Sequence, residues 1–130
     1  MNDKELVCRF FKEGYENKNF NFIMDCLSET YLDHSPAGAR CSRDAVRILM
    51  AVSEMFGDMR VRVEDVFSEN GMVATRVRFE ADHIGACMGV AATGRRIVFE
   101  ALEHFKVVDG KIVESWGYWP DKEIEDLLKE

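Results

Sequence analysis

The stretch from Arg95 to Trp119, RRIVFEALEHFKVVDGKIVESWGYW, decides the fold class of this 130-residue chain. Apolar and polar side chains alternate along it, which is the period-2 pattern of a strand with one buried face. Asp109-Gly110 interrupts the alternation with the sequence of a tight hairpin turn. The stretch therefore predicts two antiparallel strands, Arg95 to Val108 and Lys111 to Trp119.

Two further strands precede this hairpin. Residues Met59 to Phe67 and Met72 to His83 alternate in the same way, and Asn70-Gly71 between them is another hairpin sequence. A glycine-rich connection, Gly85 to Gly94, leads on to the later pair. We expect the four strands to form an antiparallel meander.

The first part of the chain has the 3.6-residue period of helices instead. An extended piece from Tyr31 to Pro36 interrupts it, because proline and the following Gly38 break a helix. Capping residues and glycine set the ends of the expected segments. The expected helices are Asp3 to Asn17, a shorter one capped by Asn19 or Asn21, one capped by Ser42 and stopped by Gly57, and a terminal one from Asp121 to Lys129.

Helices followed by a run of strands make an α+β fold, which we expect to be one domain over residues 1–130 with a pocket inside a curved sheet. The apolar fraction of 47% and charged fraction of 32% exclude a disordered chain. A net charge of −7 repels phosphate backbones and so disfavours nucleic-acid binding. No apolar run is long enough to span a membrane and the N-terminus does not read as a signal peptide, so no membrane partner is expected.

The four cysteines have no paired spacing typical of zinc sites. We expect four reduced thiols in a cytoplasmic protein. The three histidines share no spacing that would bring two ring nitrogens to one ion, so no metal site is expected.

Glu103 is the most unusual residue of the pattern, because it interrupts the apolar row Ile97, Phe99, Ala101, Phe105 and Val107. A carboxylate at such a position must be paired, protonated or placed at a wet cavity. One reading is a pocket acid with a raised pKa. The other is a structural residue that a bulge turns outward or that an arginine neutralises.

Two histidines are weaker candidates for chemistry. His83 ends the apolar face of its strand, and His34 lies in the kink before Pro36. Each could serve the pocket or could be an ordinary rim or solvated residue. His104 lies on the opposite face of its strand, where we expect it to be exposed or at an interface.

The last strand has two largely apolar rows, so alternation alone does not say which one faces the pocket. Trp116 and Tyr118 lie in one row, and Gly117 and Trp119 in the other. More apolar surface gathers near this edge than one helix layer can cover, which favours a homodimer built partly on the outer sheet face. The side chains expected to contact a substrate are His34, Tyr15, Phe99, Trp116 and Tyr118.

The chain resembles the SnoaL-like polyketide cyclase family of the nuclear transport factor 2-like superfamily. The motifs that carry the resemblance are His83-Ile84-Gly85, Met88-Gly89, Thr93-Gly94-Arg95 and the run from Asp109 to Trp116, DGKIVESW. The resemblance extends over essentially the whole chain and implies a cone: a curved antiparallel sheet wrapped around a long helix.

For chemistry, the resemblance implies intramolecular aldol ring closure of a polyketide ester, without metal or cofactor. It places the acid/base residue at Asp121, although Pro120 before it and Ser115 in the strand depart from the family pattern. Position alone makes Asp121 a helix N-cap, and one residue could do both.

Three functions follow from these residues. The leading one is a cofactor-independent cyclase that acts on an enolisable carbonyl compound with Asp121 as acid/base. The second is a ketosteroid-isomerase-like isomerase or a hydrolase in which Glu103 and His83 move protons. The third is a non-catalytic domain that binds a small apolar ligand or mediates dimerisation. Convergence of Asp121, Glu103 and His83 on one cavity would favour an enzyme.

Overall fold

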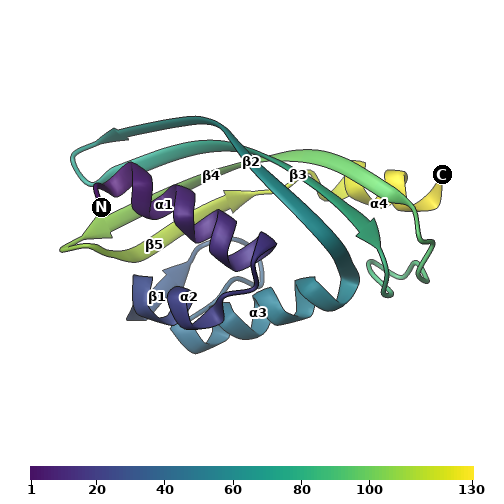
Figure 1. Ribbon diagram of the computed structural model, residues 1–130, viewed down its shortest axis with the longest axis horizontal. Coiled ribbons are helices and arrows are strands. Elements are labelled where there is room, and N and C mark those ends of the chain that lie inside the picture. The colour runs from purple at the N-terminus through teal and green to yellow at the C-terminus, as the bar shows by residue number, and fades with distance from the viewer.

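The computed structural model describes all residues, 1–130, and confirms the α+β architecture (Figure 1). One five-stranded sheet, in the order β1-β5-β4-β3-β2, curves around the N-terminal helices. The elements are α1 (Asp3–Phe11), η1 (Lys12–Glu16), α2 (Phe20–Cys26), β1 (Leu27–Asp33), α3 (Ser42–Met55), β2 (Phe56–Glu69), β3 (Met72–His83), β4 (Arg96–Val108), β5 (Lys111–Tyr118) and α4 (Asp121–Lys129).

Strands β2 to β5 form the expected antiparallel meander. Both predicted hairpin turns are present, with positive φ at Asn70 (51°), Gly71 (79°), Asp109 (49°) and Gly110 (76°). Positive φ at both central residues matches the right-handed twist of the flanking strands, which is why Asn-Gly and Asp-Gly are favoured there.

The sheet has one strand more than the meander. Because this strand is parallel to its neighbour, the expectation of an entirely antiparallel sheet was wrong. The extended piece expected from Tyr31 is part of β1, which begins at Leu27 directly after α2 and pairs parallel with β5. Its partners include Leu32 with Glu114 and Asp33 with Ser115. The pairing joins residues far apart in sequence, so the local pattern did not reveal it.

Three helix boundaries differ from the expectation. The first helix is α-helical only to Phe11 and then widens into a π-helical turn, η1. Asn19, not Asn21, caps α2 through its side-chain oxygen. Cys41 rather than Ser42 occupies the N-cap position of α3, which ends at Met55 and passes straight into β2, so Gly57 lies in a strand.

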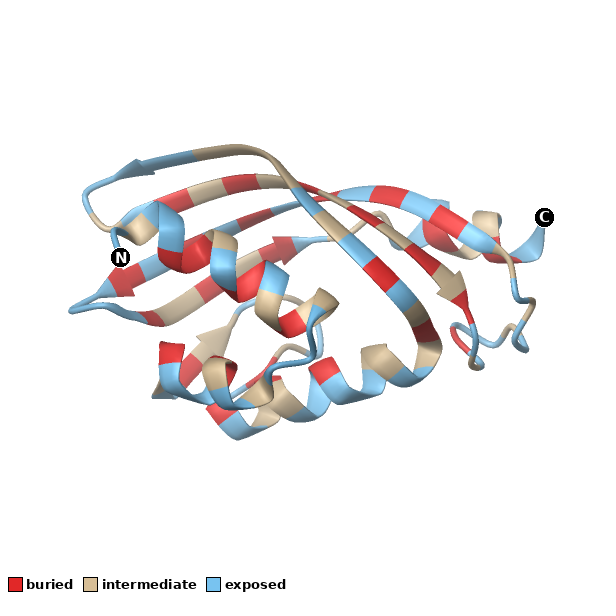
Figure 2. Cartoon of the chain, in the orientation of Figure 1, coloured by how far each residue is buried: buried red, intermediate tan, exposed pale blue.

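The core lies between the concave face of the sheet and helices α1, α2 and α3 (Figure 1). Burial alternates residue by residue along β3 and β4, as the sequence pattern predicted (Figure 2). Phe11 of α1 meets the inward rings of Phe79 and Phe105 edge-on, at centroid distances of 6.2 and 5.4 Å. No helix combines the length and apolar character that a bilayer crossing requires.

Candidate active site

A small cavity of about 40 Å³ lies where the N-terminal helices meet the concave face of the sheet. One side chain of its wall carries a buried carboxyl group, that of Glu103. Its walls come from α1, η1, β1, α3, β4 and the segment between β1 and α3. The lining residues are Phe10, Tyr15, Tyr31, Asp33, Ala39, Ala45, Ile48, Leu49, Glu103 and Phe105.

Glu103 points inward from β4 into this cavity and is 9% exposed. Its Oε1 accepts a hydrogen bond from the indole Nε1–H of Trp119 at 3.3 Å, and its Oε2 is buried without a partner. No arginine or lysine contacts it, and no bulge turns it outward. Of the two readings of the sequence, the structure therefore agrees with a buried pocket acid.

Burial is the main reason why the pKa of Glu103 is raised, from 4.5 to about 8. The Trp119 hydrogen bond lowers the pKa and the nearby Asp33 carboxylate raises it, but both effects are smaller than that of burial. At neutral pH the Glu103 carboxyl group is therefore mainly protonated, and its O–H is a hydrogen-bond donor facing the cavity.

A bulge in β5 decides which of its rows faces Glu103. The register shifts between Lys106 and Val107 of β4, so that the inward row continues from Ile112 to Ser115 and Gly117. At Gly117 a β-carbon would lie 2.6 Å from Glu103 Oε1, which makes glycine the residue that leaves room for the carboxyl group. Trp119 follows in the same row.

Two tyrosines complete the polar part of the cavity. Tyr15 comes from the π-helical turn, whose wider backbone brings the ring against Trp119 at 5.9 Å between centroids. Tyr31 comes from β1 and shares a short hydrogen bond with the hydroxyl of Ser115. Burial raises the pKa of both phenols, so each keeps its O–H at neutral pH.

Of the residues expected at the site, Glu103 and Tyr15 lie together at the cavity. Phe99 packs on Trp119 at 5.2 Å and belongs to the core next to it. His34 and Trp116 stack on each other at 4.8 Å, and His34 Nε2 lies 2.7 Å from Glu114 on the outer side of β5. The Tyr118 side chain is 72% exposed, so these last three do not line the cavity.

His83 does not join Glu103. The two residues lie on neighbouring strands, but Glu103 pairs with Thr75, eight residues before His83, a path of roughly 26 Å along the strand. His83 is fully buried, its Nδ1 accepts the backbone N–H of Thr93 at 3.2 Å, and its Nε2 has no partner.

Asp121 also lies apart from the cavity. It is exposed in the first turn of α4, and Pro120 rather than Asp121 holds the N-cap position. The Asp121 carboxylate is close enough to Cys87 to raise the pKa of that thiol, after burial, the larger cause. The three candidates for proton transfer are thus not brought together.

Sequence reasoning missed Asp33, Tyr31 and Trp119 as cavity or contact residues. Asp33 precedes the expected His34, but the direction of the β1 side chains depends on its pairing with β5. The alternation pattern does not assign Trp119 to the cavity side, because both rows of the last strand are largely apolar. A bulge was the deciding feature, and nothing in the local sequence marks it.

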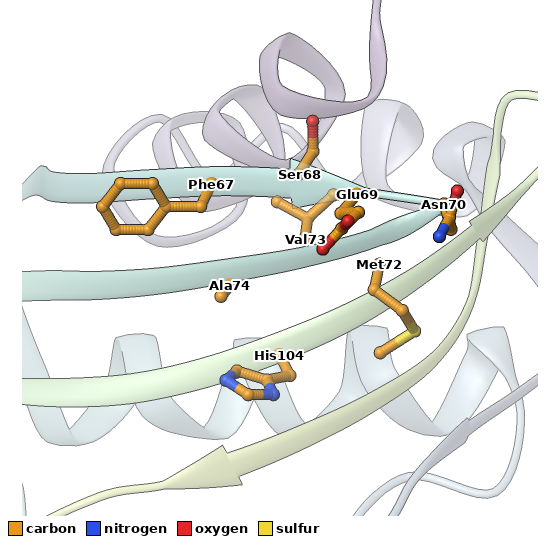
Figure 3. Close-up of a pocket in the computed structure, with 8 residues that line it drawn as sticks. All are labelled: Phe67, Ser68, Glu69, Asn70, Met72, Val73, Ala74 and His104. Atoms are coloured by element: carbon orange, nitrogen blue, oxygen red, sulfur yellow. The ribbon is translucent and has the colours of Figure 1, made fainter.

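A larger hollow of about 650 Å³ lies on the outer face of the sheet near the β2–β3 hairpin (Figure 3). Phe67, Ala74 and His104 from three neighbouring strands surround it, with Met72 toward the turn. All its polar side chains are open to solvent. The Glu103 cavity differs from this hollow in having a buried carboxyl group in its wall.

Known proteins resemble this chain both in sequence and in fold. Aklanonic acid methyl ester cyclase DnrD from Streptomyces peucetius is 32% identical over 103 residues, which cover 75% of this chain and 67% of the relative. AclR from Streptomyces galilaeus superposes with a TM-score of 0.86 at 26% identity, covering 98% of this chain and 95% of AclR.

IdmH from Streptomyces antibioticus has a TM-score of 0.87 over 100% of both chains at 22% identity, and by itself shows the fold alone. The family model described as "SnoaL-like polyketide cyclase" matches residues 5–125. That match spans nearly the whole chain, including every residue of the Glu103 cavity. The chain therefore belongs to the SnoaL-like polyketide cyclase family.

Proposed function

We propose that the chain is a cofactor-independent cyclase that closes a ring within a polyketide ester by aldol chemistry, with Glu103 as its acid. The observation that carries this proposal is the buried Glu103 carboxyl group, which faces the cavity with one oxygen unpartnered. Buried unpartnered polar groups are costly, and active sites are where such costs are retained.

Aldol ring closure involves no net oxidation or reduction. It needs proton transfer and a substrate held in the right orientation. A proton leaves the carbon next to one carbonyl, that carbon bonds to a second carbonyl carbon, and the oxygen of the second carbonyl gains a proton. A neutral carboxylic acid in an apolar site can hold the developing oxyanion through its O–H, and such assistance supplies about 10²–10⁴-fold in rate. The protonated Glu103 suits this role because its pKa of about 8 lies near neutrality.

A substrate must enlarge the cavity before it can bind. Its volume of about 40 Å³ is close to that of one water molecule, whereas small-molecule pockets typically measure about 300–1,000 Å³. Ile48 of α3 lines the cavity and is also 40% exposed, so its side chain separates the cavity from solvent. We propose that α3 and the segment before it move outward when substrate enters.

The test uses aklanonic acid methyl ester, the compound for which the Streptomyces peucetius relative is named. Ring closure is followed by chromatography for the wild-type chain, for Glu103→Gln and for the exposed control Glu29→Gln. We expect Glu103→Gln to slow ring closure by about 10²-fold or more and the control to be unchanged. No ring closure by the wild-type chain, or an active Glu103→Gln variant, would contradict the proposal.

An isomerase is the second candidate, because an acid that protonates a carbonyl oxygen also assists migration of a neighbouring double bond. The same Glu103 O–H would serve, without His83, which lies elsewhere. The two functions differ in product: a cyclase forms a carbon–carbon bond and an isomerase does not.

We also propose that the partner of the outer sheet face is a second copy of this chain. Val98, Leu102 and Tyr118 are exposed on that face, at 42%, 54% and 72%. The charges around them are paired within the chain, for example Arg76 with Asp65 and Glu100, both at 2.8 Å. Two such faces can approach without strong net repulsion, as an isologous interface requires.

We propose a reducing, cytoplasmic location for the chain, and its four cysteines support this proposal. All four are unpaired, and Cys26 and Cys87 are buried. Thiol titration of the unfolded chain without reductant should find four thiols. A result of two would mean a disulfide and would contradict the location.

A further inference from the structure

The second carboxyl group of the cavity, Asp33, is held in a defined position. It is the last residue of β1 and lines the same cavity as Glu103. Its Oδ1 accepts two hydrogen bonds from Ser35, one from the backbone N–H at 2.9 Å and one from the hydroxyl at 2.7 Å. These two hydrogen bonds fix the orientation of the Asp33 carboxyl group.

The turn that follows Asp33 packs closely against this residue. A β-carbon at Gly38 would lie 2.5 Å from the Asp33 carbonyl oxygen and 2.9 Å from its Cγ, so only glycine allows this close approach. Ser35 Oγ also accepts the backbone N–H of Gly117 at 2.9 Å. Ser35 thereby ties Asp33 to the strand position that touches Glu103.

The two carboxyl groups of the cavity have different surroundings. Glu103 is surrounded mainly by apolar groups and receives one long hydrogen bond, whereas Asp33 receives two from Ser35. A negative charge on Asp33 further opposes ionisation of Glu103. Two carboxyl groups that lie in one cavity but have such different hydrogen-bond partners are suited to different roles in proton transfer.

Other groups at the cavity are poor bases. The only other titratable side chains in its lining are Tyr15 and Tyr31, and burial raises the pKa of both. No histidine, lysine or cysteine lines the cavity. Asp33 is therefore the one group there that is built to accept a proton.

We propose that Asp33 is the catalytic base that removes the proton from the enolisable carbon while Glu103 donates its O–H to the carbonyl oxygen. This assignment rests on the proposed function and divides its acid and base roles between two residues. Asp33 takes the proton as the carbon–hydrogen bond breaks, and the electron pair passes into the enolate held by Glu103. When the enolate carbon bonds to the second carbonyl carbon, the new alkoxide recovers a proton from Asp33, so the protein ends as it began.

The experiment measures proton removal by the base and ring closure in two separate assays. Base activity is followed by ¹H NMR as the exchange of α-protons of 2-pentanone for solvent deuterium. Ring closure is followed with aklanonic acid methyl ester. The variants are Asp33→Asn, Ser35→Ala and the exposed control Asp25→Asn; asparagine keeps the oxygen that accepts from Ser35, and thermal melting checks the fold.

We expect Asp33→Asn to lower the exchange rate by about 10²-fold or more and Asp25→Asn to leave it unchanged. Ser35→Ala, which removes the hydroxyl but keeps the base, should lower it less. If Asp33→Asn does not fold, the wild-type pH profile and Ser35→Ala carry the test. Exchange should then decline as the pH rises past about 8, where Glu103 loses its proton, and should fall in Ser35→Ala.

The outcomes distinguish the two proposals. Wild-type exchange that persists in Asp33→Asn, or no exchange by the wild-type chain, would overturn Asp33 as the base. Exchange that is unaffected by Ser35→Ala and by pH near 8 would overturn it as well. Exchange that depends on Asp33 without any ring closure of the ester would overturn the cyclase function and leave the base assignment standing.

Discussion

The indole N–H of Trp119 donates to Oε1 of Glu103 at 3.3 Å and leaves Oε2 of the same carboxyl group unpartnered in the cavity wall. One side of the carboxyl group is thus fixed by the protein, and the other is free for a bound molecule. Trp119 lies just beyond the end of β5, where the bulge has turned its row inward.

Trp119→Phe tests this relationship. The hydrogen bond favours the charged form of Glu103 and lowers its pKa, so its loss should raise that pKa above about 8. Phenylalanine keeps an aromatic ring against Phe79 and Phe99, which limits the loss of packing. Carboxyl ¹³C NMR titration measures the shift. A pKa that falls or stays would show that the indole does not donate to Glu103.

Glu103→Gln should change how stability depends on pH. The folded state holds the Glu103 proton up to pH about 8, while the unfolded state loses it near 4.5. Between these values the folded state binds more protons, so this group lowers the free energy of unfolding by up to about 1.4 kcal/mol for each pH unit gained. The contribution of the Glu103 proton to the stability of the folded state is fully present below pH 4.5 and is lost above pH 8.

Glutamine does not titrate, so the free energy of unfolding of Glu103→Gln should fall less steeply from pH 5 to 8. Urea unfolding at several pH values, with the exposed Glu29→Gln as control, measures the difference. Parallel curves for wild type and Glu103→Gln would argue against a buried neutral acid.

Gly117→Ala should displace the Glu103 carboxyl group. The added methyl would lie 2.6 Å from Oε1 and 3.0 Å from Ser35 Oγ, closer than such contacts allow. We expect a loss of about 1–3 kcal/mol in stability together with slower ring closure. Adding Glu103→Asp withdraws the carboxyl group by one methylene and should recover part of that stability. Strict additivity of the two changes would mean that they do not touch.

Asp121→Asn distinguishes the acid implied by family resemblance from the one favoured by the cavity. Asp121 is exposed and outside the cavity, so we expect ring closure within about twofold of wild type. The free energy of unfolding should fall by about 0.5 kcal/mol, since a carboxylate in the first turn interacts with the dipole of α4. A 10²-fold slower variant with an unchanged melting curve would instead make Asp121 the acid/base residue.

Leu102→Lys should weaken the proposed dimer. Leu102 is 54% exposed in the centre of the outer face, beside Tyr118 on β5. A lysine there adds two like charges where the copies meet, so light scattering should find a dimer for wild type and a monomer for the variant. A wild-type chain that is monomeric at tens of micromolar would count against the interface.

Much of this molecule follows from the order of residues alone. Alternation along β3 and β4 fixed the inward face and identified Glu103 as a carboxyl group in an apolar row. Asn70-Gly71 and Asp109-Gly110 fixed two turns, because few other pairs adopt positive φ at both positions. These features depend on neighbours in sequence, where the physical chemistry is local.

Only the tertiary structure decided which residues surround Glu103. Tyr15 reaches the cavity through a π-helical turn, Asp33 through a parallel pairing of β1 with β5, and Trp119 through a bulge in β5. Each of these three features changes the direction in which a side chain points. None of them can be recognised from the composition or the hydrophobic periodicity of the sequence. Hence the sequence determined that one acid is buried, whereas long-range pairing determined which groups surround it and keep its proton in place.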